Sequence, residues 1–138
     1  MRIAVVSDIH ANLTALEAVA SDLRRVGVDL VVHGGDLVSG GEIDAIYGLQ
    51  SSVVVYGHIH QRFVRRLAPF TLVNSGAVSL SYHGDPRAAY ALIDGQHIQI
   101  KRVEYDIEEE IRLLLATDDP FAESTVETLR SGRPASPR

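Results

Sequence analysis

Acid and imidazole side chains follow three short apolar runs in this chain, and their positions restrict the folds that it can adopt. They fall at the ends of these runs in the order Asp8 and His10, then Asp36, then His58 and His60. Short runs of β-branched residues without polar alternation are typical of strands that are covered on both faces. Ligands of open α/β sheets bind where strands end. The pattern therefore predicts an α/β fold that gathers these side chains into one site able to hold a metal ion.

The first third of the chain has the pattern of a β-α-β unit. Residues 2–6 predict a strand in the middle of a sheet. Asn12 is expected to cap an amphipathic helix that ends at Gly27, and a second strand is expected over residues 29–33. Strands joined in this way are parallel and end on the same edge of the sheet, so the first two acidic motifs should lie close together.

The rest of the chain predicts more strands and then helices. Further strands are expected at residues 52–56, 63–67, 70–73, 88–93 and 98–103, with a hairpin at Gly95. We expect the last four to form a second, antiparallel sheet. Asp106 begins a helix that Pro120 ends, and a weaker amphipathic segment covers residues 121–129. We interpret residues 1–130 as a single domain and residues 131–138 as a flexible tail.

Composition limits the classes of function. The 138 residues are 46% hydrophobic, enough for one core, and the net charge of -5 argues against a nucleic-acid surface. The chain has no cysteine, which excludes disulfides and thiolate metal sites. No apolar run approaches membrane-spanning length, and none resembles a signal sequence, so we expect a cytoplasmic protein without membrane partners.

Imidazole and carboxylate ligands suit first-row divalent metals. We expect Mn, with Fe, Ni, Co or Zn as alternatives. Such an ion makes a bound water more acidic and polarises a phosphoryl oxygen, so hydrolysis of a small phosphate ester is the natural use. Taken alone, Asp-x-His and Gly-Asp are common turn sequences, and two histidines flanking one residue can be a surface pair. It is the joint placement of the three motifs at strand ends that favours a metal site.

These motifs resemble those of the calcineurin-like metallophosphoesterase superfamily, in particular its small bacterial and archaeal phosphodiesterases. The resemblance rests on residues 7–13, 34–38 and 57–60, and more weakly on residues 73–78 and 84–90. It implies a β-sandwich flanked by helices with two metal ions at the strand ends. By resemblance, the first metal would be bound by Asp8, His10, Asp36 and His60. Asp36 would also bridge to a second metal that His58 helps to hold, which gives Asp36 and His58 catalytic roles.

The chain departs from the family pattern in its middle. The family has a Gly-Asn-His motif and a further lone histidine between the second and third motifs, and residues 36–57 contain neither. The fold is therefore expected to be truncated in the middle, with an incomplete second metal site. Of the other histidines, we expect His33 to pack in the core, His83 to lie in a loop that can reach the cleft, and His97 to belong to a hairpin.

Loss of the family's middle block should also uncover apolar surface. An open sheet edge or a bare face is most simply covered by a second copy of the chain, so we expect a homodimer.

Three hypotheses follow from the sequence. The first is a metal-dependent phosphoesterase with reduced activity, acting on a phosphodiester or a phosphomonoester. The second is a non-catalytic remnant that binds metal and acts as an assembly or interaction module. The third is a plain α/β domain whose histidines are incidental.

Overall fold

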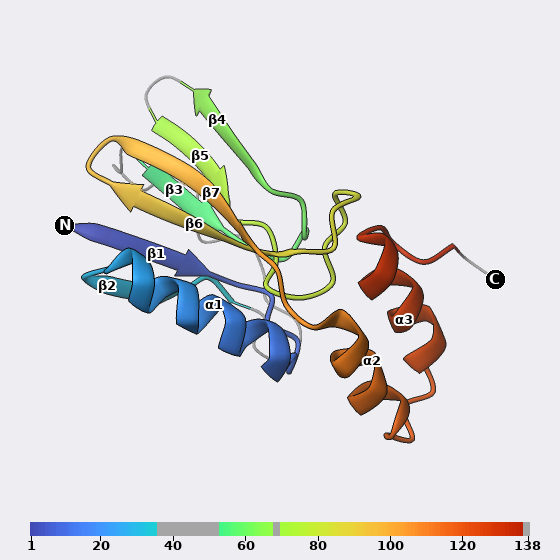
Figure 1. The fold of residues 1–138 in the computed structure, drawn as a ribbon. Coiled ribbons are helices and arrows are strands. Elements are labelled where there is room, and N and C mark those ends of the chain that lie inside the picture. Colours follow the sequence, from blue (N-terminus) through green and yellow to red (C-terminus); the bar gives the residue numbers. More distant parts are fainter. Residues whose placement is uncertain (36–52, 68–69, 137–138) are drawn as a thin grey trace.

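The structure is a computed structural model that describes residues 1–35, 53–67 and 70–136. Its helices and strands are β1 (Arg2–Val6), α1 (Leu13–Val26), β2 (Leu30–His33), β3 (Val53–Tyr56), β4 (Phe63–Leu67), β5 (Phe70–Asn74), β6 (Ala88–Asp94), β7 (His97–Val103), α2 (Ile107–Leu115) and α3 (Ala122–Ser131). The strands form a larger sheet in the order β2-β1-β6-β7 and a smaller sheet in the order β3-β5-β4. Figure 1 shows the smaller sheet above the larger one, α1 below it, and α2 and α3 at one end.

The larger sheet lies in the middle of the fold because β1 and β6 are apolar on both faces. Ala4 of β1 and Tyr90 of β6 are fully buried on the face that packs against α1. Val5 of β1 and Ala91 of β6 face the other way, where they pack against Val73 of the smaller sheet. The result is a mixed α/β fold of three layers, a helix and two sheets, and this confirms the predicted class of sandwich flanked by helices.

Capping residues set the bounds of the helices. The Asn12 side chain accepts a hydrogen bond from Ala15 N at 2.8 Å at the start of α1, and Gly27 ends the helix in the left-handed conformation at φ 69°. Asp106 caps α2 in the same way by accepting from Glu109 N at 2.9 Å. These caps confirm the helix starts expected from the sequence. No helix in the described part of the chain is long and apolar enough to cross a membrane.

The sheet membership of several strands differs from the prediction. β6 and β7 do not join β4 and β5 in a second antiparallel sheet, because β6 pairs antiparallel with β1 and adds both strands to the larger sheet. β3 belongs to the smaller sheet, where it is parallel to β5. The parallel pairing of β1 with β2 is confirmed. The strands that end in the predicted ligands therefore come from two sheets rather than from one.

The position of β2 corrects the expectation for His33. β2 is at an edge of the larger sheet as far as the structure describes it, and its residues are exposed, His33 included. The His33 ring is therefore not part of the core, and its Nδ1 accepts a hydrogen bond from Gly35 N at 3.1 Å. Leu30, Val31 and Val32 of the same strand are 40–49% exposed, so the described part of the chain has apolar surface at this edge.

Asp85 joins the two sheets through three arginines. Arg87 holds its carboxylate by two hydrogen bonds, at 2.9 Å to Oδ1 and 2.8 Å to Oδ2. Arg62, which precedes β4 of the smaller sheet, lies 3.4 Å from Oδ2, and Arg102 of β7 in the larger sheet lies 3.2 Å from it. The hydrogen bonds from Arg87 hold the pKa of Asp85 far below its usual value of 3.8, although desolvation opposes them.

This cluster predicts how stability depends on pH. A carboxylate whose pKa is lowered by folding stabilises the protein above its unfolded pKa, and this stabilisation is lost as the pH falls toward its folded pKa. Asp85→Asn should lower the free energy of unfolding at pH 7 by about 1–2 kcal/mol, because three guanidinium groups lose a charged partner. Urea unfolding measures this: as the pH falls from about 6 to about 2, the free energy of unfolding should decrease less in this variant than in the wild type.

Asp94→Asn provides the control, since Asp94 pairs with Arg2 at an exposed position and its replacement should cost less than about 1 kcal/mol. Parallel pH profiles for wild type and Asp85→Asn would contradict the role given to the Asp85 cluster.

Candidate metal centre

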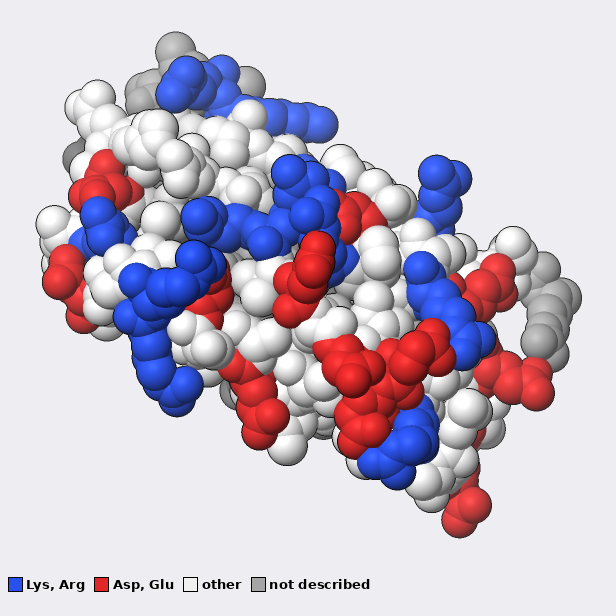
Figure 2. Space-filling view, viewed as in Figure 1, with Lys and Arg blue, Asp and Glu red and all other residues white. Residues whose placement is uncertain are grey.

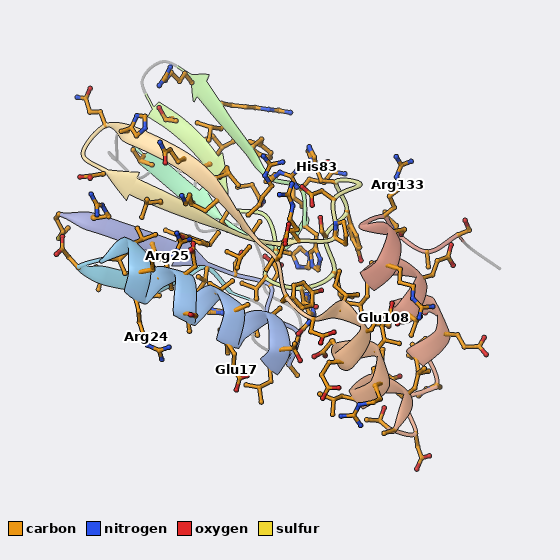
Figure 3. All side chains as sticks on the ribbon, viewed as in Figure 1. Glu17, Arg24, Arg25, His83, Glu108 and Arg133 are labelled. Atoms are coloured by element: carbon orange, nitrogen blue, oxygen red, sulfur yellow. The ribbon has the colours of Figure 1, made fainter. Side chains whose placement is uncertain are left out.

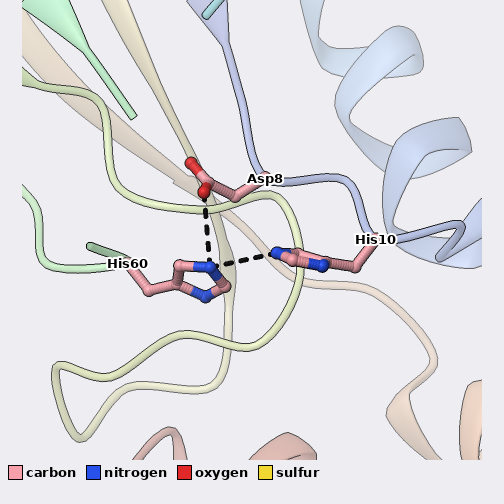
Figure 4. A group of neighbouring side chains, drawn as sticks. All are labelled: Asp8, His10 and His60. Carbon is pink, nitrogen blue, oxygen red and sulfur yellow. Dashed lines mark hydrogen bonds and ion pairs between the residues drawn. The ribbon is translucent and has the colours of Figure 1, made fainter. Parts of the chain in front are cut away.

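The predicted metal ligands lie in loops at the common end of the two sheets. The loop after β1 carries Asp8 and His10, and the loop after β3 carries His60 (Figure 4). A third loop, between β5 and β6, lies against the first, with Ser79 N donating to the Asp8 carbonyl at 2.9 Å. The site therefore depends on how the two sheets stack, and not on one strand edge alone.

Asp8, His10 and His60 turn their ligand atoms toward one another (Figure 4). His60 Nε2 lies 3.0 Å from His10 Nε2 and 3.3 Å from Asp8 Oδ1, and the three ligand atoms are all within 4.8 Å of one another. Ligand atoms that share one divalent ion at about 2.0–2.2 Å lie about 3 Å apart when they are neighbours around it. The spacing fits a divalent metal. Two imidazoles and one carboxylate also leave coordination positions for water or substrate.

The hydrogen bond on the far side of the His60 ring supports this assignment. His60 Nδ1 lies 2.7 Å from the Leu80 carbonyl oxygen, which can only accept, so Nδ1 carries a proton. In the neutral ring Nε2 then directs a lone pair at the Asp8 carboxylate. The lone pairs of His60 Nε2 and Asp8 Oδ1 repel at 3.3 Å. A cation between these two atoms, or a second proton on the His60 ring, makes the contact attractive. A backbone carbonyl on the second ring nitrogen is also the usual partner of a metal-binding histidine.

Asp8 brings a charged ligand to a fully buried position. Burial raises the pKa of its carboxyl group, but the neighbouring His60 imidazole and hydrogen bonds from Ser7 and the His58 amide outweigh burial and hold the pKa below 3.8. Ser7 Oγ donates to Oδ2 at 2.6 Å, and His58 N donates to Oδ1 at 2.8 Å. The carboxylate is therefore ionised at neutral pH and can bind a cation.

The backbone of the two ligand loops is strained. Asp8, His10, His58 and His60 all have φ between 49° and 78°, in the left-handed region that side chains other than glycine rarely adopt. Every described non-glycine residue with positive φ lies in the three loops of this site; the remaining two are Ala11 and Leu80. Strain of this kind costs of order 1 kcal/mol per residue or more and is concentrated at functional sites. This argues against the hypothesis that the histidines are incidental.

Gly57 permits the close approach of the two ligand loops. A Cβ at this position would lie 2.6 Å from Asp8 Oδ2 and 2.6 Å from Ser7 Oγ, closer than such contacts occur. The glycine of the Gly-His-x-His motif is therefore required by packing, since it brings the His58 amide within hydrogen-bond distance of the Asp8 carboxylate.

A buried polar network holds these loops in place, and the sequence analysis did not assign it a role. Ser7 Oγ is 2.8 Å from Ser75 Oγ. Asn74 Nδ2 donates to the Gly57 carbonyl at 3.2 Å, while Asn74 Oδ1 accepts from Gly76 N at 2.9 Å. The signal in the sequence is the Asn-Ser-Gly segment that begins at the last residue of β5, within one of the weaker family motifs.

The other predicted site residues are placed differently. The amide of His58 contacts Asp8, whereas its side chain is exposed. Asp36, the predicted bridging ligand, lies outside the described residues, so its position and its predicted catalytic role are not tested. His83 is exposed in the loop between β5 and β6, and His97 is at the start of β7, in the hairpin expected from the sequence.

Comparisons with known proteins identify the family of this chain and proteins with a similar fold. Residues 1–73 match the calcineurin-like phosphoesterase family. Among solved structures, the fold is similar to a metallophosphoesterase from Sphaerobacter thermophilus, with a TM-score of 0.77 and 21% identity over 96% of this chain and 100% of that chain. An archaeal phosphodiesterase has a TM-score of 0.60 and 17% identity over 74% and 99% of the two chains. The phosphoesterase YfcE from E. coli has a TM-score of 0.58 and 17% identity over 77% and 100%. No curated protein matches the chain.

The family match defines a protein of the metallophosphoesterase class. The chain belongs to the calcineurin-like phosphoesterase family, since more than half of its length matches that family.

Substitution of Gly57 tests how the site is assembled. Gly57→Ala should weaken binding of Mn²⁺ at least tenfold, because the new methyl group displaces the Asp8 carboxylate. Titration calorimetry with Mn²⁺ measures this change. Gly95→Ala is the control, because a Cβ there meets no atom within 4 Å and its backbone strain is confined to the distant hairpin. Equal Mn²⁺ affinity in both variants would contradict the packing argument.

Proposed function

We propose that this protein hydrolyses phosphate esters with a divalent metal ion bound by Asp8, His10 and His60, to which Asp36 contributes a further ligand. The observation that carries the proposal is the convergence of one buried carboxylate and two imidazole nitrogens at 3.0 and 3.3 Å. Membership of the calcineurin-like phosphoesterase family supplies the class of reaction. We expect Mn²⁺ as the ion, with Fe, Ni, Co or Zn as alternatives.

The protein groups around the site have separable tasks. Asp8 supplies negative charge, and its two hydrogen bonds from Ser7 and the His58 amide fix the orientation of its carboxylate. The Leu80 carbonyl keeps the proton of His60 on Nδ1, so that Nε2 is available as a ligand. A divalent ion held by these groups supplies an acidic bound water and polarisation of the phosphoryl oxygen.

We expect the activity to be low. The sequence has no asparagine followed by histidine, so the imidazole that protonates the leaving group in the family is missing. General acid catalysis contributes about 10²- to 10⁴-fold, and hydrolysis should be slower by a factor of this size. His58 remains a candidate ligand for a second metal, because its backbone amide contacts Asp8 and its side chain is exposed.

The missing motif also favours a second candidate function. A protein that binds the metal but lacks the family's catalytic imidazole can act as a metal-stabilised assembly module. The exposed apolar residues of β2 offer a surface for a second copy of the chain, in line with the predicted homodimer.

Hydrolysis of bis(p-nitrophenyl) phosphate with added Mn²⁺ tests the proposal. Wild type should release p-nitrophenol, and His60→Gln should reduce the rate at least about a hundredfold, because it removes a buried ligand. His97→Gln is the matched control, since it alters an exposed histidine in the β6–β7 hairpin and should leave the rate unchanged. Mn²⁺ binding without any hydrolysis would contradict the enzymatic proposal and favour the assembly module. Equal rates in wild type and His60→Gln would contradict the site itself.

A further inference from the structure

A groove of about 680 Å³ lies between the loop that joins β5 to β6 and the C-terminal end of α3. It is lined by Gln61, Tyr82, His83, Gly84, Arg133, Pro134, Ala135 and Ser136. Figure 3 shows His83 on the loop and Arg133 at the end of the helix. Of these residues, Gln61 follows His60 in the chain and Tyr82 contacts the His60 ring.

The groove begins one aromatic ring away from the metal centre. The Tyr82 ring stacks on the His60 ring, with centroids 4.6 Å apart and planes 20° apart. Tyr82 N donates to the His60 carbonyl at 3.2 Å, and Gln61 is the next residue after His60. These contacts place the groove beside His60, with the Tyr82 ring between the groove and the metal centre.

The walls of the groove are fixed relative to each other. Gly84 N donates to the Gly132 carbonyl at 2.6 Å, which ties the loop to the end of α3. A Cβ at Gly132 would lie 2.6 Å from Asp85 N, so only glycine allows this contact. Arg133 N donates to Ser131 Oγ at 3.1 Å, which positions the backbone of the arginine at the rim of the groove.

The groove is electropositive. Within the described residues no carboxylate forms an ion pair with Arg133. The adjoining Asp85 is surrounded by Arg62, Arg87 and Arg102, so three positive charges against one negative charge leave two in excess. Glu104 acts on Arg87 and offsets one of these. Figure 2 shows basic side chains distributed over this face with some acidic ones among them, and an acidic group over α2.

We propose that this groove binds a second phosphate of the substrate, so that the preferred ester carries two phosphate groups. The proposal rests on the proposed function, because the first phosphate is assigned to the metal centre. Arg133 is the specificity-determining residue, since a guanidinium pairs with phosphate oxygens through two parallel hydrogen bonds. Tyr82 separates the two phosphate positions.

Binding of two nucleotides tests this assignment. Calorimetry in the presence of Mn²⁺ compares adenosine 3′,5′-bisphosphate with adenosine 5′-monophosphate, which share every group except one phosphate. Wild type should bind the bisphosphate about ten- to a hundredfold more tightly. Arg133→Gln should remove this preference, and Arg133→Lys should retain part of it. Arg24→Gln, an exposed arginine on α1 far from the groove (Figure 3), should keep the full preference.

The outcomes separate the two proposals. Equal affinity of wild type for both nucleotides, or an unchanged preference in Arg133→Gln, overturns the groove assignment and leaves the metal-dependent hydrolysis intact. The metal centre is contradicted instead if the affinity for adenosine 5′-monophosphate is the same with and without Mn²⁺ and is also unchanged in His60→Gln. A preference for the bisphosphate that Arg133→Gln abolishes supports the groove whichever result the monophosphate gives.

Discussion

The structure depends on a buried negative charge that needs a positive partner. The Asp8 carboxylate is fully inaccessible to solvent. The Leu80 carbonyl holds the His60 proton on Nδ1, so in the neutral ring the lone pair of His60 Nε2 faces the lone pairs of the Asp8 carboxylate. Hydrogen bonds from Ser7 and the His58 amide stabilise this carboxylate, but neither brings a positive charge to it. A divalent ion between Asp8, His10 and His60 would resolve this conflict, and it would give a physical reason for the strained loops that surround it.

The stacking of the two sheets brings the ligand loops together into one site. The loop after β1 belongs to the larger sheet and the loop after β3 to the smaller one, and they meet where Gly57 permits contact with Asp8. Asn74 and Ser75 hold the junction from the end of β5, and Asp85 joins the two sheets through its arginines. Positive φ at the ligands is maintained because packing on both sides leaves the loops no relaxed alternative.

Several strands, the bounds of α1 and the three ligand residues could be predicted, because each is indicated by a short stretch of sequence. Apolar runs identify β1 and β6, Asn12 and Gly27 bound α1, and the acid and histidine spacing identifies Asp8, His10 and His60 as one group. Strand pairing was predicted less well, because the hydrophobic pattern of β6 is equally compatible with either sheet, and only contact with β1 decides. His33 was misplaced for the same reason, since an edge strand and a central strand have similar sequences. The network behind Asp8 was missed because asparagine and serine are common in ordinary turns.

Diffraction from crystals soaked in Mn²⁺ tests the central claim most directly. We predict an anomalous peak about 2.0–2.2 Å from Asp8 Oδ1, His10 Nε2 and His60 Nε2, with the ring of His60 still bonded to the Leu80 carbonyl. Crystals that take up no ion at this position would contradict the account.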